Sequence, residues 1–151
     1  MPAVLAPTRE AKDETASASE WAQGDAAPRK DGPIPVLVVD DQETFRAALR
    51  DLVAATNGLT LIGEAASGEA ALEAVAELCP RLVIIDNRMP GMSGIEATRL
   101  LSARHPDVVV VLVSAEAFED PAARSCGAAA FACKHDLSPR LLRELWRNHG
   151  S

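Results

Sequence analysis

Residues 36–52, VLVVDDQETFRAALRDL, contain the pattern that decides the expected fold. An apolar run ends at two adjacent carboxylates, Asp40 and Asp41, and apolar residues at helical spacing follow at once. A continuous apolar run is typical of a strand that is buried on both faces. The stretch therefore predicts a buried strand joined closely to a helix, and it leaves two like charges at the strand's end to be explained.

The same alternation continues along the chain to residue 149. The predicted strands are 34–39, 59–66, 81–86, 108–114 and 128–134, and the predicted helices are 43–56, 67–78, 93–105, 118–127 and 138–149. Strands that alternate with helices imply a parallel sheet covered on both faces. We therefore expect an α/β fold, a doubly wound, flavodoxin-like (βα)5 arrangement with strand order 2-1-3-4-5.

The composition limits the function classes. The chain has 151 residues and a net charge of -7, so its overall field disfavours direct binding to nucleic acid. Its three cysteines form no CxxC motif, which argues against a disulfide framework or a zinc site. No apolar run approaches the roughly 18 residues of a membrane span, and the N-terminus has no secretory signal pattern. We expect a cytoplasmic protein without membrane association.

Residues 1–33 differ from the rest of the sequence. They are rich in Ala, Pro, Ser, Thr and mixed charges, and no apolar stripe runs through them. We expect a disordered N-terminal tail over residues 1–33, in which Trp21 is the one residue suited to docking, followed by a folded domain over residues 34–149.

Polar side chains stand at the ends of four predicted strands. Asp40 and Asp41 follow the first, Asp86 ends the third, Ser114 ends the fourth and Lys134 ends the fifth. The carboxyl ends of parallel strands meet at one edge of the sheet, where ligands bind at the switch point between strands 1 and 3. We therefore expect these five side chains to converge on one site.

Clustered carboxylates at this edge need compensation. Two of them about 4 Å apart repel by about 4 kcal/mol at an effective dielectric near 20. Such a cluster requires a cation or raised pKa values. Oxygen ligands suit Mg²⁺, and Mg²⁺ together with Lys134 over one central carboxylate suits a phosphoryl group.

The combination VLVVDD…LVIIDNRMPGMSG…VVVVLVSA…AAAFACK resembles the receiver domain of two-component response regulators, over residues 34 to about 149. The resemblance implies that Asp86 is the phosphoacceptor. It also implies a Mg²⁺ site formed by Asp40, Asp41, Asp86 and the backbone carbonyl of Arg88, in which Asp41 is favoured over Asp40 as the direct ligand of the acidic pair.

The resemblance assigns further roles by position. Ser114 and Lys134 are expected to contact the phosphoryl group, and Ser114 and Phe131 to form the switch. Pro90 and Gly94 are expected to shape the loop beyond the phosphoacceptor. The implied function is phosphotransfer from a histidine kinase or histidine phosphotransfer protein, followed by a population shift that changes binding to a downstream protein partner. The chain would then catalyse only its own phosphorylation and dephosphorylation; homodimerisation is left open.

Parts of the chain depart from the family pattern. The segment between Ser114 and Gly127 is shorter than in typical receivers and contains Pro121, so we expect a short or distorted helix there. His135 stands where many receivers have proline, and a cis bond is therefore not expected. The run KHDLSPRLLREL is most similar to receivers that precede a helix-turn-helix output domain; because the sequence ends at Ser151, we expect a stand-alone receiver.

Two alternative functions remain open. The first is a receiver-shaped interaction domain that works without phosphorylation, which the shortened segment after Ser114 and the acidic tail permit. The second is a Mg²⁺-dependent phosphohydrolase of the haloacid dehalogenase class, which also uses an aspartate nucleophile. That class has a second aspartate two residues after the nucleophile, where this chain has Arg88.

Simpler structural roles also remain open for single residues. Asp40 or Asp41 could be a helix N-cap, Ser114 an ordinary hydroxyl at a strand end, and Lys134 a solvated charge. Arg88 and Glu116, which flank the expected site, could either tune the access of attacking water or be solvated charges.

Overall fold

The computed structural model describes residues 32–116 and 120–150. The chain divides into two units, and nearly all of the described residues belong to the second unit, Pro33–Ser151. The tail predicted at 1–33 therefore lies outside the described residues, except for Gly32 and Pro33, and its disorder stays a prediction.

Strands and helices alternate along the described residues, as the sequence predicts, with a 3-10 helix in place of an α-helix between the fourth and fifth strands. The strands are β1 (Ile34–Val39), β2 (Leu59–Ala65), β3 (Leu82–Asp86), β4 (Val109–Ser114) and β5 (Ala130–Cys133). The α-helices are α2 (Glu43–Ala54), α3 (Gly68–Leu78), α4 (Gly94–Arg104) and α5 (Pro139–His149). These elements differ from the predicted ones only at their ends.

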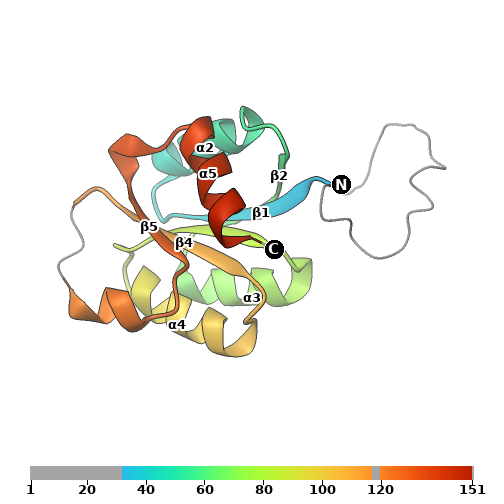
Figure 1. Ribbon diagram of the computed structural model, residues 1–151. Coiled ribbons are helices and arrows are strands. Elements are labelled where there is room, and N and C mark those ends of the chain that lie inside the picture. Colours follow the sequence, from blue (N-terminus) through green and yellow to red (C-terminus); the bar gives the residue numbers. More distant parts are fainter. Residues whose placement is uncertain (1–31, 117–119, 151) are drawn as a thin grey trace. The chain divides into compact units, whose positions relative to one another are not determined.

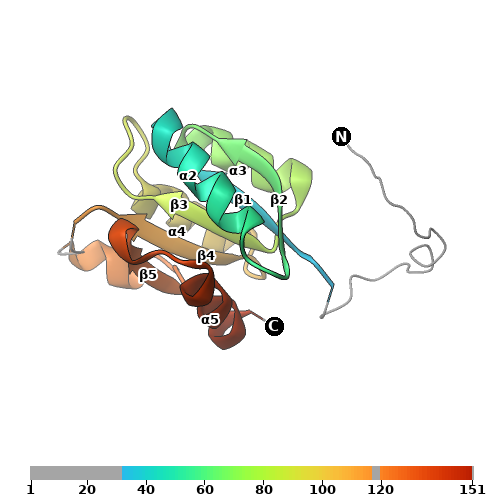
Figure 2. The ribbon, with the colours of Figure 1, turned by 90° about the horizontal axis from the view of Figure 1, so that it is seen from above.

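The strands form one parallel sheet in the predicted order, β2-β1-β3-β4-β5. Figures 1 and 2 show α2 and α5 on one face of this sheet and α3 and α4 on the other. Because β1 pairs with both β2 and β3, the switch point of the doubly wound fold lies between β1 and β3.

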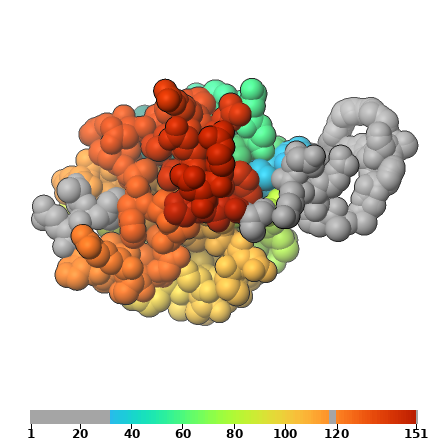
Figure 3. All heavy atoms as spheres, viewed as in Figure 1, coloured from blue at the N-terminus to red at the C-terminus, as the bar shows by residue number. Residues whose placement is uncertain are grey.

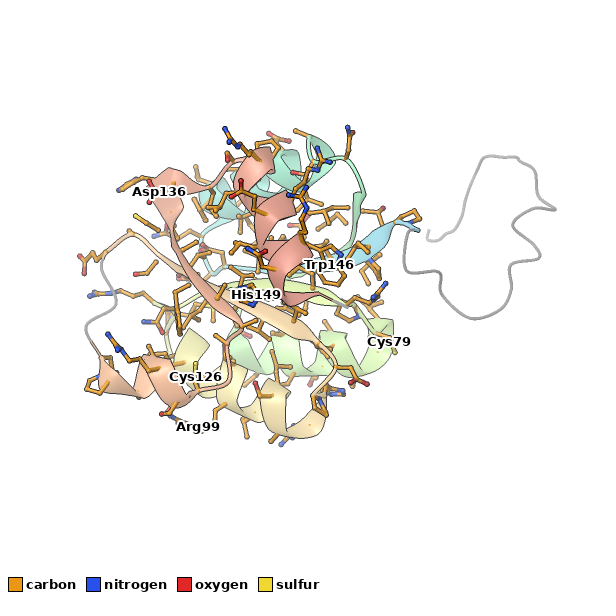
Figure 4. The ribbon with its side chains drawn as sticks, in the orientation of Figure 1. Cys79, Arg99, Cys126, Asp136, Trp146 and His149 are labelled. Atoms are coloured by element: carbon orange, nitrogen blue, oxygen red, sulfur yellow. The ribbon has the colours of Figure 1, made fainter. Side chains whose placement is uncertain are left out.

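The sheet separates two hydrophobic clusters, because successive side chains of a strand point to opposite faces. In β1, Leu37 and Val39 join the cluster with α3 and α4, whereas Val36 and Val38 join the cluster with α2 and α5. Burial on both faces explains why the strands are continuous apolar runs. Trp146, labelled on α5 in Figure 4, packs against the second cluster.

Serine N-caps fix where three helices begin. The hydroxyls of Ser67, Ser93 and Ser138 each accept a hydrogen bond from a backbone N–H in the first turn of α3, α4 and α5. Ser93 also forms a capping box with Glu96.

The predicted helix over 118–127 is a 3-10 helix, η1 (Pro121–Ser125), within the described part of that segment. Asp120 caps it by accepting a hydrogen bond from the backbone N–H of Ala122. The prediction of a short or distorted helix is confirmed; a 3-10 turn covers more length per residue than an α-helix and suits a shortened connection. A second 3-10 helix, η2 (Lys134–Asp136), starts where the fifth strand was expected to end.

In the space-filling view of Figure 3, α5 (dark red) and the segment around β5 (orange-red) cover much of the face turned to the viewer. Among the described residues, no helix combines the length and the apolar character that crossing a bilayer requires.

Candidate functional site

The acidic side chains at the ends of β1 and β3 converge, as predicted. Asp40, Asp41 and Asp86 each offer one carboxylate oxygen, and these three oxygens lie within 4.8 Å of one another. They meet because β1 and β3 are neighbouring parallel strands whose carboxyl ends share one edge of the sheet. The two like charges after β1 are thus part of a single three-carboxylate cluster.

Lys134 lies beside this cluster and is not a solvated surface charge. Its Nζ is 3.1 Å from Oδ2 of Asp40 and 3.1 Å from Oδ1 of Asp86. Its side chain is only 13% exposed, and the carboxylates of Asp40 and Asp86 are buried. A buried ammonium between two buried carboxylates offsets part of their repulsion.

The acidic pair does not provide the N-cap of α2, because that position belongs to Gln42. Instead Asp40 is fully engaged: Oδ1 accepts a hydrogen bond from the Gln42 N–H at 2.8 Å, and Oδ2 faces Lys134. The Asp40 carbonyl accepts a hydrogen bond from the Arg46 guanidinium at 2.8 Å. Asp41, in contrast, is exposed. Its carboxylate is therefore the better placed of the pair to take an ion from solvent.

The charges of the cluster shift the pKa values of two of its members. Burial, followed by the charge of Asp40, raises the pKa of Asp86 to about 6, against the opposing effect of its hydrogen bond with Lys134. Burial works to lower the pKa of Lys134, but its hydrogen bonds to Asp40 and Asp86 outweigh burial and raise it. One ammonium thus compensates three carboxylates only in part, and an all-oxygen donor set of this kind fits Mg²⁺.

The loop after β3 is held tightly beside Asp86. The Asn87 N–H donates to the Val113 carbonyl, and the Asn87 carbonyl accepts from the Gly94 N–H, both at 2.9 Å. A Cβ atom on Gly94 would lie 2.3 Å from the Asp86 carbonyl oxygen. Only glycine therefore lets α4 begin this close to the end of β3, while the ligand role of the Arg88 carbonyl stays a prediction.

Ser114 and Phe131 lie on the neighbouring strands β4 and β5. Ser114 is buried at the end of β4, and its Oγ accepts a hydrogen bond from the Glu116 N–H at 3.2 Å. This contact leaves the hydroxyl proton of Ser114 available to another acceptor. Phe131 is 39% exposed, which makes it one of the few large apolar side chains on the described surface. Their joint movement stays a prediction.

Arg88 and Glu116, which the sequence leaves as either functional or solvated, form an ion pair. Nη2 of Arg88 lies 2.7 Å from Oε1 of Glu116, and both side chains are largely exposed. The pair links the loops that follow β3 and β4. Position 88 therefore carries a paired cation, and it does not supply the acid that a haloacid dehalogenase would have there.

Phe45 is a neighbour of the site that the sequence indicates only as a core residue. Its ring centroid lies 4.0 Å from Nζ of Lys134, and the ring also packs against the cluster shared by α2 and α5. Phe45 and Lys134 line a groove of about 340 Å³, together with Leu52 and Leu137. The available signal was its position, an aromatic residue in the first turn after the acidic pair.

Comparisons with known proteins agree with this geometry. The family model for the response regulator receiver domain matches residues 36–143. Response regulator GacA from Pseudomonas viridiflava is 46% identical over 88 residues, which are 58% of this chain and 41% of that protein. Protein-glutamate methylesterase/protein-glutamine glutaminase 4 from Geobacter metallireducens is 46% identical over 79 residues, 52% of this chain and 23% of that protein. The match thus spans less than half of either relative.

Solved structures extend the likeness to the whole described fold. The signal receiver domain of the putative response regulator NarL from Mycobacterium tuberculosis has a TM-score of 0.69 at 28% identity, with 78% of this chain and 95% of that chain covered. The response regulator domain of Thermotoga maritima CheB has a TM-score of 0.68 at 31% identity, with coverage of 78% and 96%. The match over residues 36–143 and the shared five-stranded fold show that the chain belongs to the response regulator receiver domain family.

Proposed function

We propose that Asp86 accepts a phosphoryl group from a histidine kinase or histidine phosphotransfer protein, and that this modification switches binding to a downstream protein. The observation that carries the proposal is the buried contact of Lys134 with Asp40 and Asp86, next to the exposed carboxylate of Asp41. In this arrangement the Asp86 carboxylate, whose negative charge is only partly compensated, lies beside the ammonium of Lys134. We further propose a cytoplasmic location without direct contact to nucleic acid or membrane.

Asp86 is suited to act as the nucleophile. With a pKa of about 6 it is largely ionised at neutral pH. Its Oδ1 faces Lys134, so Oδ2 is the oxygen that attacks phosphorus. The new Oδ2–P bond forms as the P–N bond of the phosphohistidine breaks, and the electron pair stays on the imidazole nitrogen. Lys134 stabilises the negative charge on the phosphoryl oxygens during transfer.

The metal site of the proposal consists of Asp40, Asp41, Asp86 and the carbonyl of Arg88. The donor set fits Mg²⁺ because every proposed ligand is a hard oxygen, and three of the carboxylate oxygens lie within one ion's reach. When bound, Mg²⁺ would supply the positive charge that a phosphoryl group needs and that Lys134 alone does not provide.

The proposed switch uses the hydroxyl of Ser114. A phosphoryl group on Asp86 adds about -1.5 to -2 charges and strong acceptor oxygens, to which Ser114 can donate its proton. Phe131, on the adjacent strand and partly exposed, would then change its packing. The surface that changes includes β4, β5 and η1, and this is where we propose that the downstream partner binds.

The test is phosphorylation by a small donor. Incubation with Mg²⁺ and acetyl phosphate should increase the protein mass by one phosphoryl group, and Asp86→Asn should abolish the increase. Asp107→Asn is the matched control, because Asp107 is an exposed aspartate outside the acidic cluster. This variant should label normally. Labelling of the Asp86→Asn protein at the wild-type rate would refute the assignment.

A receiver-like interaction domain that works without phosphorylation is the second candidate. The observation that favours it is η1, a 3-10 helix in the segment between β4 and β5, which belongs to the surface proposed to switch. Partner binding that is equal for wild type, the phosphorylated protein and Asp86→Asn would support this second candidate.

A further inference from the structure

The ammonium of Lys134 has an aromatic neighbour in addition to its two carboxylates. Its Nζ lies 4.0 Å from the centre of the Phe45 ring. The face of an aromatic ring carries partial negative charge and attracts cations within about 6 Å. Because the Lys134 side chain is only 13% exposed, water competes weakly for this ammonium. The ring and the carboxylates therefore both attract the cation.

The contacts that fix Asp40 also fix Phe45. Phe45 lies in the first turn of α2, and that turn is tied to the end of β1 in two places. The Gln42 N–H donates to the Asp40 carboxylate, and the Arg46 guanidinium donates to the Asp40 carbonyl. The ring thus has a defined position relative to the acidic cluster, whereas a lysine side chain has a long flexible stem with many rotamers.

The ring contact differs from the carboxylate contacts in how it responds to phosphorylation. Once Asp86 becomes an acyl phosphate, its own carboxylate charge is lost, and its direct pull on Lys134 weakens. The quadrupole of the Phe45 ring does not change in that step. The ring and the Lys134 side chain line the same groove as Leu52 and Leu137, so loss of the ring would leave the Lys134 side chain more open to water.

The geometry points to Phe45 as a positioning residue for Lys134: its ring holds the ammonium at the phosphoacceptor site and so strengthens binding of a phosphoryl group there. This inference rests on the proposed function of Asp86. Phe45 contacts no reacting atom in this scheme. It acts through the side chain of Lys134.

Three variants test the inference. Phe45→Leu removes the ring and keeps an apolar side chain, and Phe45→Tyr keeps the ring. Leu52→Val alters the same groove and keeps the Phe45 ring, and it is the matched control. In the protein without Mg²⁺, the Lys134 methylene protons next to Nζ should show an upfield ring-current shift by NMR. Phe45→Leu should lose that shift, while Phe45→Tyr and Leu52→Val should keep it.

The functional measurement is the affinity for beryllofluoride, a phosphoryl mimic, in the presence of Mg²⁺. Phe45→Leu should bind it about fivefold to tenfold more weakly than wild type, and Phe45→Tyr and Leu52→Val should bind as wild type does. If Phe45→Leu does not fold, stepwise fluorination of the Phe45 ring keeps its shape and weakens its negative face. Affinity should then fall with each fluorine.

The outcomes separate the inference from the proposed function. Wild-type protein that binds no beryllofluoride contradicts the proposed function, and the inference fails with it. Wild-type binding that Phe45→Leu or full ring fluorination leaves unchanged contradicts the inference alone. An unshifted Lys134 methylene signal in wild type also overturns it, because the ring would then not lie against the side chain in solution.

Discussion

Nζ of Lys134 lies 3.1 Å from Oδ1 of Asp86, although Lys134 follows β5 and Asp86 ends β3, and β4 separates these two strands in the sheet. The lysine therefore reaches across the end of an intervening strand, and its charge joins the two halves of the doubly wound fold at the site. Ser114 ends the strand in between. Variants that change the charges of this cluster should therefore change the free energy of unfolding, which can be measured.

Asp86→Asn should stabilise the protein at neutral pH. The pKa of Asp86 is raised from 3.8 to about 6, so between about pH 4 and pH 6 the folded state binds more protons at this residue than the unfolded state does, and stability falls as pH rises through that window. The full shift corresponds to at most about 3 kcal/mol, and screening by water reduces it to about 1 kcal/mol.

The measurement is urea unfolding of wild type and Asp86→Asn at about pH 5 and about pH 7.5. The stability difference between the two proteins should grow toward the higher pH. A difference that does not depend on pH would show that Asp86 titrates normally in the folded protein. Asp107→Asn, which changes an exposed aspartate outside the cluster, is the control for removal of one carboxylate.

Lys134→Met should destabilise the protein, because it leaves the buried carboxylates of Asp40 and Asp86 without their cation. Removal of one partner of a buried ion pair costs about 3 kcal/mol. Adding Asp86→Asn to the variant should recover part of this loss by removing one uncompensated charge. Chemical denaturation of the two single variants and the double variant measures this coupling.

The matched control is Arg143→Met, which removes an exposed cation of α5. Its stability should differ little from wild type, since surface charges contribute little. Equal effects of Lys134→Met and Arg143→Met would contradict the buried bridge.

The sequence predicts the framework of the fold and the members of the acidic cluster for a clear physical reason. Apolar periodicity identifies the strands, and parallel connection brings their carboxyl ends to one edge, so Asp40, Asp41 and Asp86 had to be neighbours once the strand order was inferred. Pro121 and the short connection were also enough to indicate a weakened helix before β5.

The contacts that the sequence did not predict depend on rotamers and loop paths. The ring of Phe45 could pack in the core without touching Lys134, and its helical spacing is the same in both cases. The pairing of Arg88 with Glu116 depends on the course of two loops, which periodicity does not constrain. The close approach of Gly94 to Asp86 likewise follows from a folded loop.

Asp41→Asn should weaken Mg²⁺ binding with little effect on the stability of the metal-free protein. Asp41 is exposed, whereas Asp40 also binds Lys134 and the Gln42 N–H. A bound ion stabilises the fold according to its concentration and dissociation constant. The rise in melting temperature on adding Mg²⁺ should therefore be smaller in Asp41→Asn than in wild type.

Glu73→Gln, on the exposed side of α3, controls for a general loss of negative charge. It should show the wild-type response to Mg²⁺. A full response in Asp41→Asn would exclude this residue as a ligand.

Gly94→Ala should both destabilise the fold and slow phosphorylation. The added Cβ would lie 2.3 Å from the Asp86 carbonyl oxygen, so either α4 or the end of β3 must move, and overpacking of this kind costs about 1–3 kcal/mol. Gly68→Ala is the control, because the atoms nearest its Cβ would be side-chain atoms of Met92 at 3.0 Å, and not backbone at the phosphoacceptor. Thermal unfolding and the rate of labelling by acetyl phosphate should separate the two variants. Equal labelling rates would show that the displacement does not reach Asp86.

The Arg88–Glu116 ion pair should affect the lifetime of the phosphoryl group more than the stability of the fold. Both side chains are largely exposed, so breaking the pair should change stability by no more than about 1 kcal/mol. The pair links the loops after β3 and β4, and its loss should let water reach the acyl phosphate more easily. Hydrolysis, which returns the Asp86 carboxylate and inorganic phosphate, should therefore be faster in Arg88→Gln and in Glu116→Gln.

A charge swap distinguishes the pair from its individual charges. The double variant Arg88→Glu with Glu116→Arg keeps the ion pair and reverses its direction, so it should recover much of the wild-type lifetime, measured as the decay of labelled protein after removal of the donor. High salt should shorten the wild-type lifetime, because an exposed pair is screened. If the swapped protein decays as fast as the single variants, then the separate charges, and not the bridge between the loops, control hydrolysis.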